Sequence, residues 1–159
     1  MIDAEQREIL KKYEQQVPVP VGKLAHDLGI KVSLASLSPS ISGLIEPDDE
    51  ASADFRIRIN RYESDERQRF TIAHEIAHFL LHREFIRNGI IDNVMYRSGL
   101  SSKREAEANR LAADIIMPMP RVLEELRRLG GIRDEATAIS LARAFKVSLP
   151  AMKVRLGIG

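Results

Sequence analysis

Residues Phe70 to His82 read FTIAHEIAHFLLH. On an α-helix, His74 and His78 lie one turn apart on the same face, with Glu75 beside them. Two imidazole nitrogens at this spacing can hold one metal ion, and the neighbouring glutamate can take a proton from a water molecule that the ion activates. The positions between the histidines are apolar, so the helix is predicted to be buried, where polar groups need a partner. The pattern therefore predicts a zinc site with His74 and His78 as ligands and Glu75 as general base.

A catalytic zinc site needs a third protein ligand, because three side chains leave the fourth position to water. His82 lies two turns beyond His74, and a helix rises about 12 Å over that distance, which excludes direct bonds from both rings to one ion. Later in the chain, Glu105 and Asn109 share one helix face, while Glu107 points away from both. We predict Glu105 as the third ligand and Asn109 as a hydrogen-bond partner of a histidine ring, with Glu107 as the alternative ligand.

The composition limits the class of protein. The chain has 159 residues, of which 44% are hydrophobic and 30% are charged, and its net charge is +1. These values are typical of a globular protein and predict no general attraction to nucleic acid or membranes. The absence of cysteine excludes disulfides and thiolate zinc sites. A polar N-terminus and the lack of a long apolar run predict neither a signal peptide nor a membrane span, so we expect a cytoplasmic protein.

Hydrophobic periodicity and capping residues predict the order of helices and strands. Helices are expected at residues 4–16, 20–28, 65–83, 103–117, 121–129, 134–145 and 148–156. Strands are expected at residues 30–37, 41–46 and 53–60, of which the last two form a hairpin. Residues 87–102 are rich in glycine, asparagine and serine, and are expected to form a long connection that is a candidate lid over the site.

The segment 54–60 reads DFRIRIN and alternates strictly between polar and apolar residues. This alternation predicts a strand with one buried and one wet face. Arg56 and Arg58 on the wet face are typical of an edge strand. Two interpretations follow. The arginines only keep an edge strand soluble, or the edge pairs with an extended peptide substrate beside the helix that carries His74 and His78.

The elements together predict an α+β fold with helices packed on a short, mainly antiparallel sheet. We expect a single domain over residues 1–159, with a catalytic core at about 20–120 and a helical C-terminal part at about 121–159. The C-terminal part has eight basic and four acidic residues, and its last two helices meet at a tight turn, Lys146-Val147-Ser148. A helix-turn-helix that binds DNA is one hypothesis, but two packing helices with a solvated face is the interpretation we favour.

Two parts of the chain match the motifs of a known family. They read RFTIAHEIAHFLLH at Arg69–His82 and EAEANRLAADIIMP at Glu105–Pro118. These parts resemble the ImmA/IrrE family of zinc metallopeptidases, and weaker similarity covers about residues 20–156. The second part departs from the family pattern at Leu111, where phenylalanine is usual, and at Ile115-Ile116, where two leucines are usual. Both departures keep an apolar core.

The resemblance implies a small zincin-like α+β domain that holds one zinc ion per chain with His74, His78 and a glutamate. It also implies a zinc-dependent endopeptidase in which Glu75 is general base and later proton donor. Family members typically act on helix-turn-helix repressors, cleaving or otherwise inactivating them to switch on mobile-element or stress genes. The expected protein substrate is therefore such a repressor. By residue type alone, Tyr96 and His82 are candidates to stabilise the oxyanion.

Other functions fit the same residues. The protein could bind a repressor without cutting it, bind DNA as a regulatory module, or serve in a toxin–antitoxin pair. The ligand types also leave room for manganese in place of zinc.

Overall fold

The computed structural model describes residues 2–87, 90–93 and 101–159. Within these residues the helices and strands follow each other in the order α1 (Ala4–Glu14), α2 (Val21–Asp27), β1 (Lys31–Ala35), β2 (Ile41–Pro47), β3 (Phe55–Asn60), α3 (Asp65–His82), the 3-10 turn η1 (Arg83–Phe85), β4 (Ile90–Asn93), α4 (Ser102–Ile116), α5 (Met119–Arg128), α6 (Glu135–Phe145) and α7 (Leu149–Leu156). The predicted helices and strands are all present, with ends that differ by one or a few residues. The fold is α+β, as the sequence predicts, and has the make-up of a small zincin-like domain.

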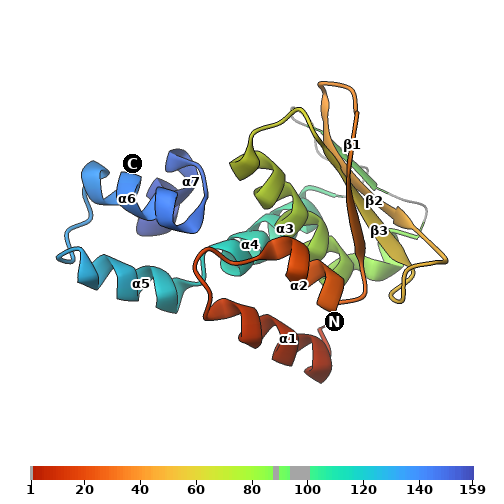
Figure 1. The fold of residues 1–159 in the computed structure, drawn as a ribbon, viewed down its shortest axis with the longest axis horizontal. Helices are drawn as coiled ribbons and strands as arrows, with labels where there is room; N and C mark the ends of the chain where they lie inside the picture. The colour runs from red at the N-terminus through yellow and green to blue at the C-terminus, as the bar shows by residue number, and fades with distance from the viewer. Residues whose placement is uncertain (1, 88–89, 94–100) are drawn as a thin grey trace.

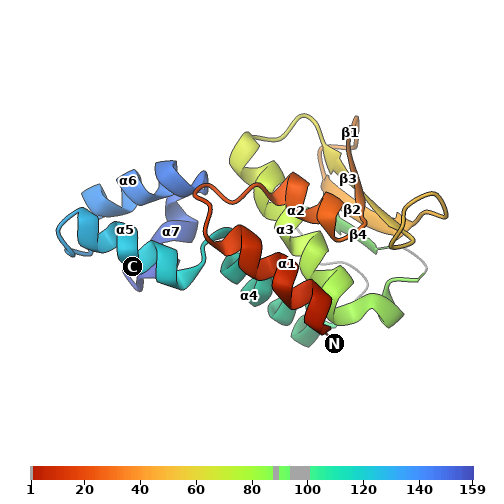
Figure 2. The same ribbon diagram turned by 60° about the horizontal axis from the view of Figure 1, so that its bottom comes forward.

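The sheet lies at one end of the molecule and helices α5, α6 and α7 lie at the other, with α3 and α4 between them (Figure 1). The turned view shows the same arrangement, with α1 lying across α4 (Figure 2). Helix α3 packs against α4 on one side and against β2 and β3 on the other. The helix that carries both histidines is therefore covered from two sides.

The four strands of the sheet lie in the order β1-β3-β2-β4. Strand β1 runs parallel to β3, whereas β2 is antiparallel to both β3 and β4. The prediction of a short, mainly antiparallel sheet is confirmed. A strand that the sequence did not predict, β4, lies inside the segment expected to be a long connection. Of the candidate lid segment 87–102, residues 88–89 and 94–100 lie outside the described residues.

The prediction that β3 is an edge strand is wrong. It lies between β1 and β2, so both of its edges are already paired, and a peptide substrate cannot add to it. Arg56 is the cross-strand partner of Glu46 on β2, and both Arg56 and Arg58 form ion pairs with that glutamate. The alternation of the sequence correctly indicated a wet face. The arginines stabilise a cross-strand charge pair on this face and do not mark an edge.

Gly43 of β2 allows the sheet to lie close to α3, the helix that carries His74 and His78. A Cβ atom added at Gly43 of β2 would lie 2.8 Å from Cγ2 of Thr71 on α3 and 3.0 Å from the backbone oxygen of Arg58. Both distances are shorter than normal van der Waals contact. Thr71 is one turn before Glu75, so this contact helps to set the position of the site.

We expect Gly43→Ala to lower the free energy of unfolding by about 1–3 kcal/mol, because the added methyl group overpacks the contact between β2 and α3. Urea unfolding followed by circular dichroism measures the change. The matched control is Gly22→Ala in α2, where an added Cβ meets no atom within 4 Å, and we expect no loss of stability there. A Gly43→Ala variant as stable as the unchanged protein would contradict the account of this contact.

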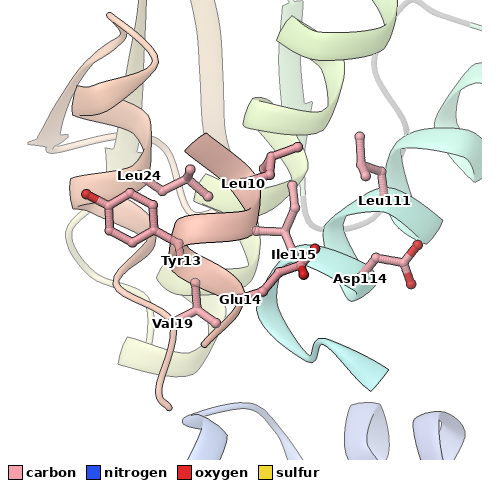
Figure 3. Close-up of a pocket in the computed structure, with 8 residues that line it drawn as sticks. All are labelled: Leu10, Tyr13, Glu14, Val19, Leu24, Leu111, Asp114 and Ile115. Atoms are coloured by element: carbon pink, nitrogen blue, oxygen red, sulfur yellow. The ribbon is translucent and has the colours of Figure 1, made fainter. Parts of the chain in front are cut away.

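The N-terminal helices complete the core beside α4. Leu10 of α1 and Leu24 of α2 line, together with Ile115 of α4, a hollow of about 50 Å³ (Figure 3). This volume is well below that of typical ligand pockets. The hollow is therefore a packing gap between helices, and α1 and α2 cover the face of α4 there.

The side chain of Arg69 links α3 to the C-terminal end of α6. The guanidinium of Arg69 on α3 donates hydrogen bonds to the backbone oxygens of Val19, Phe145 and Lys146. Phe145 ends α6 and Lys146 follows it, so the positive charge sits at the C-terminus of that helix, where the helix dipole favours a cation. Burial lowers the pKa of Arg69.

Candidate metal centre

Three potential ligands meet where α3 packs against α4. His74 and His78 come from α3, and Glu105 comes from the first turn of α4. Nε2 of His74 lies 3.2 Å from Oε1 of Glu105, and Nε2 of His78 lies 3.1 Å from Oε2 of Glu105. One ligand atom from each residue lies within 4.8 Å of the others. The three side chains are therefore close enough to bind one ion.

Helix capping helps to place these side chains. The hydroxyl of Ser64 accepts a hydrogen bond from the backbone N–H of Arg67 and caps the start of α3. The hydroxyl of Ser101 accepts one from Arg104 and starts α4. Glu105 consequently points from the first turn of α4 toward the histidines of α3.

The residues present fit a divalent metal ion. Two imidazole nitrogens and a carboxylate oxygen are a donor set that catalytic zinc sites use, and zinc ligands at about 2.1 Å in a tetrahedron lie about 3.4 Å apart. The histidine and glutamate atoms lie close to that spacing. His74, His78 and Glu105 are 5%, 0% and 2% exposed. Groups of this kind are costly to bury unless a strong partner compensates them, and a cation shared by all three is such a partner.

Glu75 lies on α3 directly beside His74 and is fully buried. It is not part of the group of possible metal ligands found in the described residues. A carboxylate next to a metal site can act as an acceptor and donor of protons. The location of Glu75 thus fits the role of general base that its place in the sequence suggests.

A comparison with protein families supports this description of the site. A family model described as the IrrE N-terminal-like domain, a peptidase family, matches residues 25–157. The chain belongs to this family. The matched residues include both histidines, Glu75 and Glu105. A comparison with curated proteins finds no match.

Membership in the IrrE N-terminal-like family gives the chain a metallopeptidase-type function, and a peptidase acts on a protein substrate. The resemblance stated from the sequence motifs is thus confirmed at the level of the family. Within the described residues, no helix is long and apolar enough to cross a membrane.

The two glutamates of α4 that the sequence left as alternatives have different surroundings. Glu105 faces both histidines of the triad, whereas Oε1 of Glu107 lies 3.0 Å from Nε2 of His82. The structure thus favours Glu105 as the third ligand. Both glutamates contact α3, and they differ in which histidines of that helix they meet.

His82 has a contact that the sequence analysis did not assign. Its Nδ1 lies 3.0 Å from Nδ1 of His78, on the side of that ring away from Glu105. Burial lowers the pKa of His82, and the hydrogen bond with Glu107 acts in the opposite direction. The same hydrogen bond lowers the pKa of Glu107. The spacing of four residues between His78 and His82 was the signal in the sequence for this contact.

The sequence also named Asn109 and Tyr96 as candidates for roles at the site. Asn109, predicted as a hydrogen-bond partner of a histidine ring, lines a surface hollow together with Phe70. Tyr96, a candidate for the oxyanion, lies outside the described residues.

Proposed function

We propose that this chain is a zinc-dependent endopeptidase that cleaves a helix-turn-helix transcriptional repressor and so derepresses mobile-element or stress genes. The observation that carries the proposal is the fully buried carboxylate of Glu75 beside a buried triad of metal-ligating groups, in a chain of a peptidase family. The similarity of the two motifs to the ImmA/IrrE family supports a repressor as the substrate.

His74, His78 and Glu105 would hold the ion, which would act as a Lewis acid toward the scissile carbonyl and lower the pKa of a water molecule. Glu75 would take the proton from the attacking water and later give it to the leaving amine. Because Glu75 is fully buried, its carboxylate is held among packed side chains and needs little reorganisation before it accepts the proton.

We place part of the peptide substrate in a hollow about one helical turn from the triad. It has a volume of about 510 Å³ and is lined by Phe70 of α3, Asn109 of α4, and Ala151 and Val154 of α7. The ring of Phe70 lies 6.5 Å from the ring of His74, measured between centroids. The hollow therefore begins about one helical turn from the candidate metal site. Its volume suits the side chains that flank a scissile bond.

The DNA-binding hypothesis receives less support from the last helix. Nζ of Lys153 lies 3.1 Å from a carboxylate oxygen of Glu135, and Nη2 of Arg155 lies 2.8 Å from one of Asp114. These two basic side chains of α7 thus already have acidic partners within the chain. Phosphate contacts would have to displace those partners, so we do not favour DNA as the ligand.

We further infer that residues 1–159 act as one domain in the cytoplasm. One hydrophobic cluster joins buried side chains from the sheet, from α3 and α4, and from α6 and α7. A cytoplasmic peptidase would also share its compartment with a transcriptional repressor.

The test is a cleavage assay with a panel of purified helix-turn-helix repressors, analysed by gel electrophoresis and intact-protein mass spectrometry. We expect zinc-loaded protein to cut one repressor at a defined bond, a chelator to stop the reaction, and added zinc to restore it. A repressor that forms a stable complex with the zinc-loaded protein and stays intact would overturn the proposal in favour of a binding module.

A further inference from the structure

A line of three side chains leads from the candidate metal site toward the surface. Nδ1 of His78 lies 3.0 Å from Nδ1 of His82, and Nε2 of His82 lies 3.0 Å from Oε1 of Glu107. His82 is 4% exposed, while the side chain of Glu107 is 36% exposed. The line thus joins a fully buried ring to a carboxylate that reaches solvent.

The donors and acceptors in this line allow one arrangement of protons when Glu107 is ionised and His82 is neutral. A carboxylate only accepts hydrogen bonds, so Nε2 of His82 carries the proton and donates it to Glu107. Nδ1 of a neutral His82 is then an acceptor, and Nδ1 of His78 must carry the proton that it receives. This arrangement leaves the lone pair of His78 on Nε2, the atom that lies 3.1 Å from Glu105.

We propose that His82 and Glu107 are positioning residues for the metal, which hold His78 in the tautomer and orientation that present Nε2 to the triad. The proposal rests on the proposed function, since it takes His78 as a metal ligand. Metal-bound histidines usually donate their second N–H to a carboxylate, a backbone carbonyl or a water molecule. Here the imidazole of His82 lies between His78 and the carboxylate of Glu107. A partly exposed residue of α4 thus supports the buried ligand.

The experiment measures the dissociation constant for zinc by competition with a chromophoric chelator. In His82→Leu, an apolar side chain of similar size leaves the N–H of His78 without its acceptor, and we expect zinc to bind about 10–100-fold more weakly. In His82→Gln, the amide oxygen can accept from His78 and the amide N–H can donate to Glu107. We therefore expect this conservative variant to restore most of the affinity. A merely structural role for His82 would not produce this rescue.

Glu107→Ala tests the outer end of the line, and we expect it to weaken zinc binding about tenfold. Its partial exposure makes this variant suitable even if His82→Leu does not fold. The matched control is Asp114→Asn on the same helix, whose carboxylate pairs with Arg155 and not with the histidines, and it should bind zinc like the unchanged protein.

Three results would contradict the positioning role or the proposed function. If the unchanged protein binds zinc, and His82→Leu and Glu107→Ala bind it equally tightly, the positioning role is wrong while the metal site stands. If the unchanged protein does not bind zinc at all, the proposed function itself fails. Weak binding in His82→Leu that His82→Gln does not restore would also overturn the positioning role.

Discussion

Glu75→Gln is expected to abolish cleavage while the metal stays bound. Glutamine has nearly the shape of glutamate, so the neighbouring His74 keeps its packing, but the amide cannot take a proton from water. General acid–base catalysis typically contributes a factor of about 10²–10⁴, and cleavage should fall by at least that much. The initial rate on the repressor identified in the panel gives the effect, and elemental analysis of the same sample gives the metal content.

The control for this variant is Glu84→Gln, which changes an exposed glutamate of η1 just beyond the metal helix. It should cleave at the rate of the unchanged protein. A Glu75→Gln variant that holds metal and cleaves at the normal rate would show that another group accepts the proton.

His78→Ala is expected to lose the metal. The unchanged protein should contain about one zinc ion per chain by elemental analysis, and the variant should contain almost none, because a side chain that lies beside Glu105 in the triad is removed. Zinc binding should also stabilise the unchanged protein. At a free concentration 100 times the dissociation constant, the gain is about 2.7 kcal/mol, and the variant should show no gain. Thermal unfolding with and without zinc measures this difference.

His26→Ala is the matched control, because the side chain of His26 is 87% exposed and lies in α2, away from the triad. It should keep both the metal and the stabilisation. Full zinc content in His78→Ala would exclude this ring as a ligand. Folded, metal-free wild-type protein that takes up no added zinc would argue against the enzyme and leave a binding module as the better explanation.

The sequence predicts those features of the site that depend on residues close together in the chain. His74, Glu75 and His78 follow from the spacing of one helix, and capping serines mark where both helices of the site begin. From the local sequence, Glu105 is separated from Glu107 only by the helix face that it shares with Asn109. The two glutamates are distinguished by the histidines of α3 that they meet, which depends on how α4 packs along α3.

The structure differs from the sequence-based predictions mainly in strand pairing. The alternation of polar and apolar residues along β3 shows which face of the strand is exposed to solvent. It does not show whether one or two strands pair with β3. The short strand β4 lies in a segment whose glycine and asparagine residues favour loops, and its pairing with β2 overrides that local preference. The line from His78 to Glu107 was also missed, because its outer end lies on another helix.

Arg69 has a consequence for any attempt to shorten the protein. Its guanidinium draws two of its three backbone acceptors from Phe145 and Lys146, residues that a fragment ending near residue 120 would lack. Such a fragment would keep His74, His78 and Glu105 but leave the Arg69 guanidinium with one of its three backbone acceptors, five residues before the first histidine. The loss would destabilise α3, the helix that carries both histidines. We therefore expect a fragment that ends near residue 120, just beyond the candidate ligands, to be less stable than the full chain.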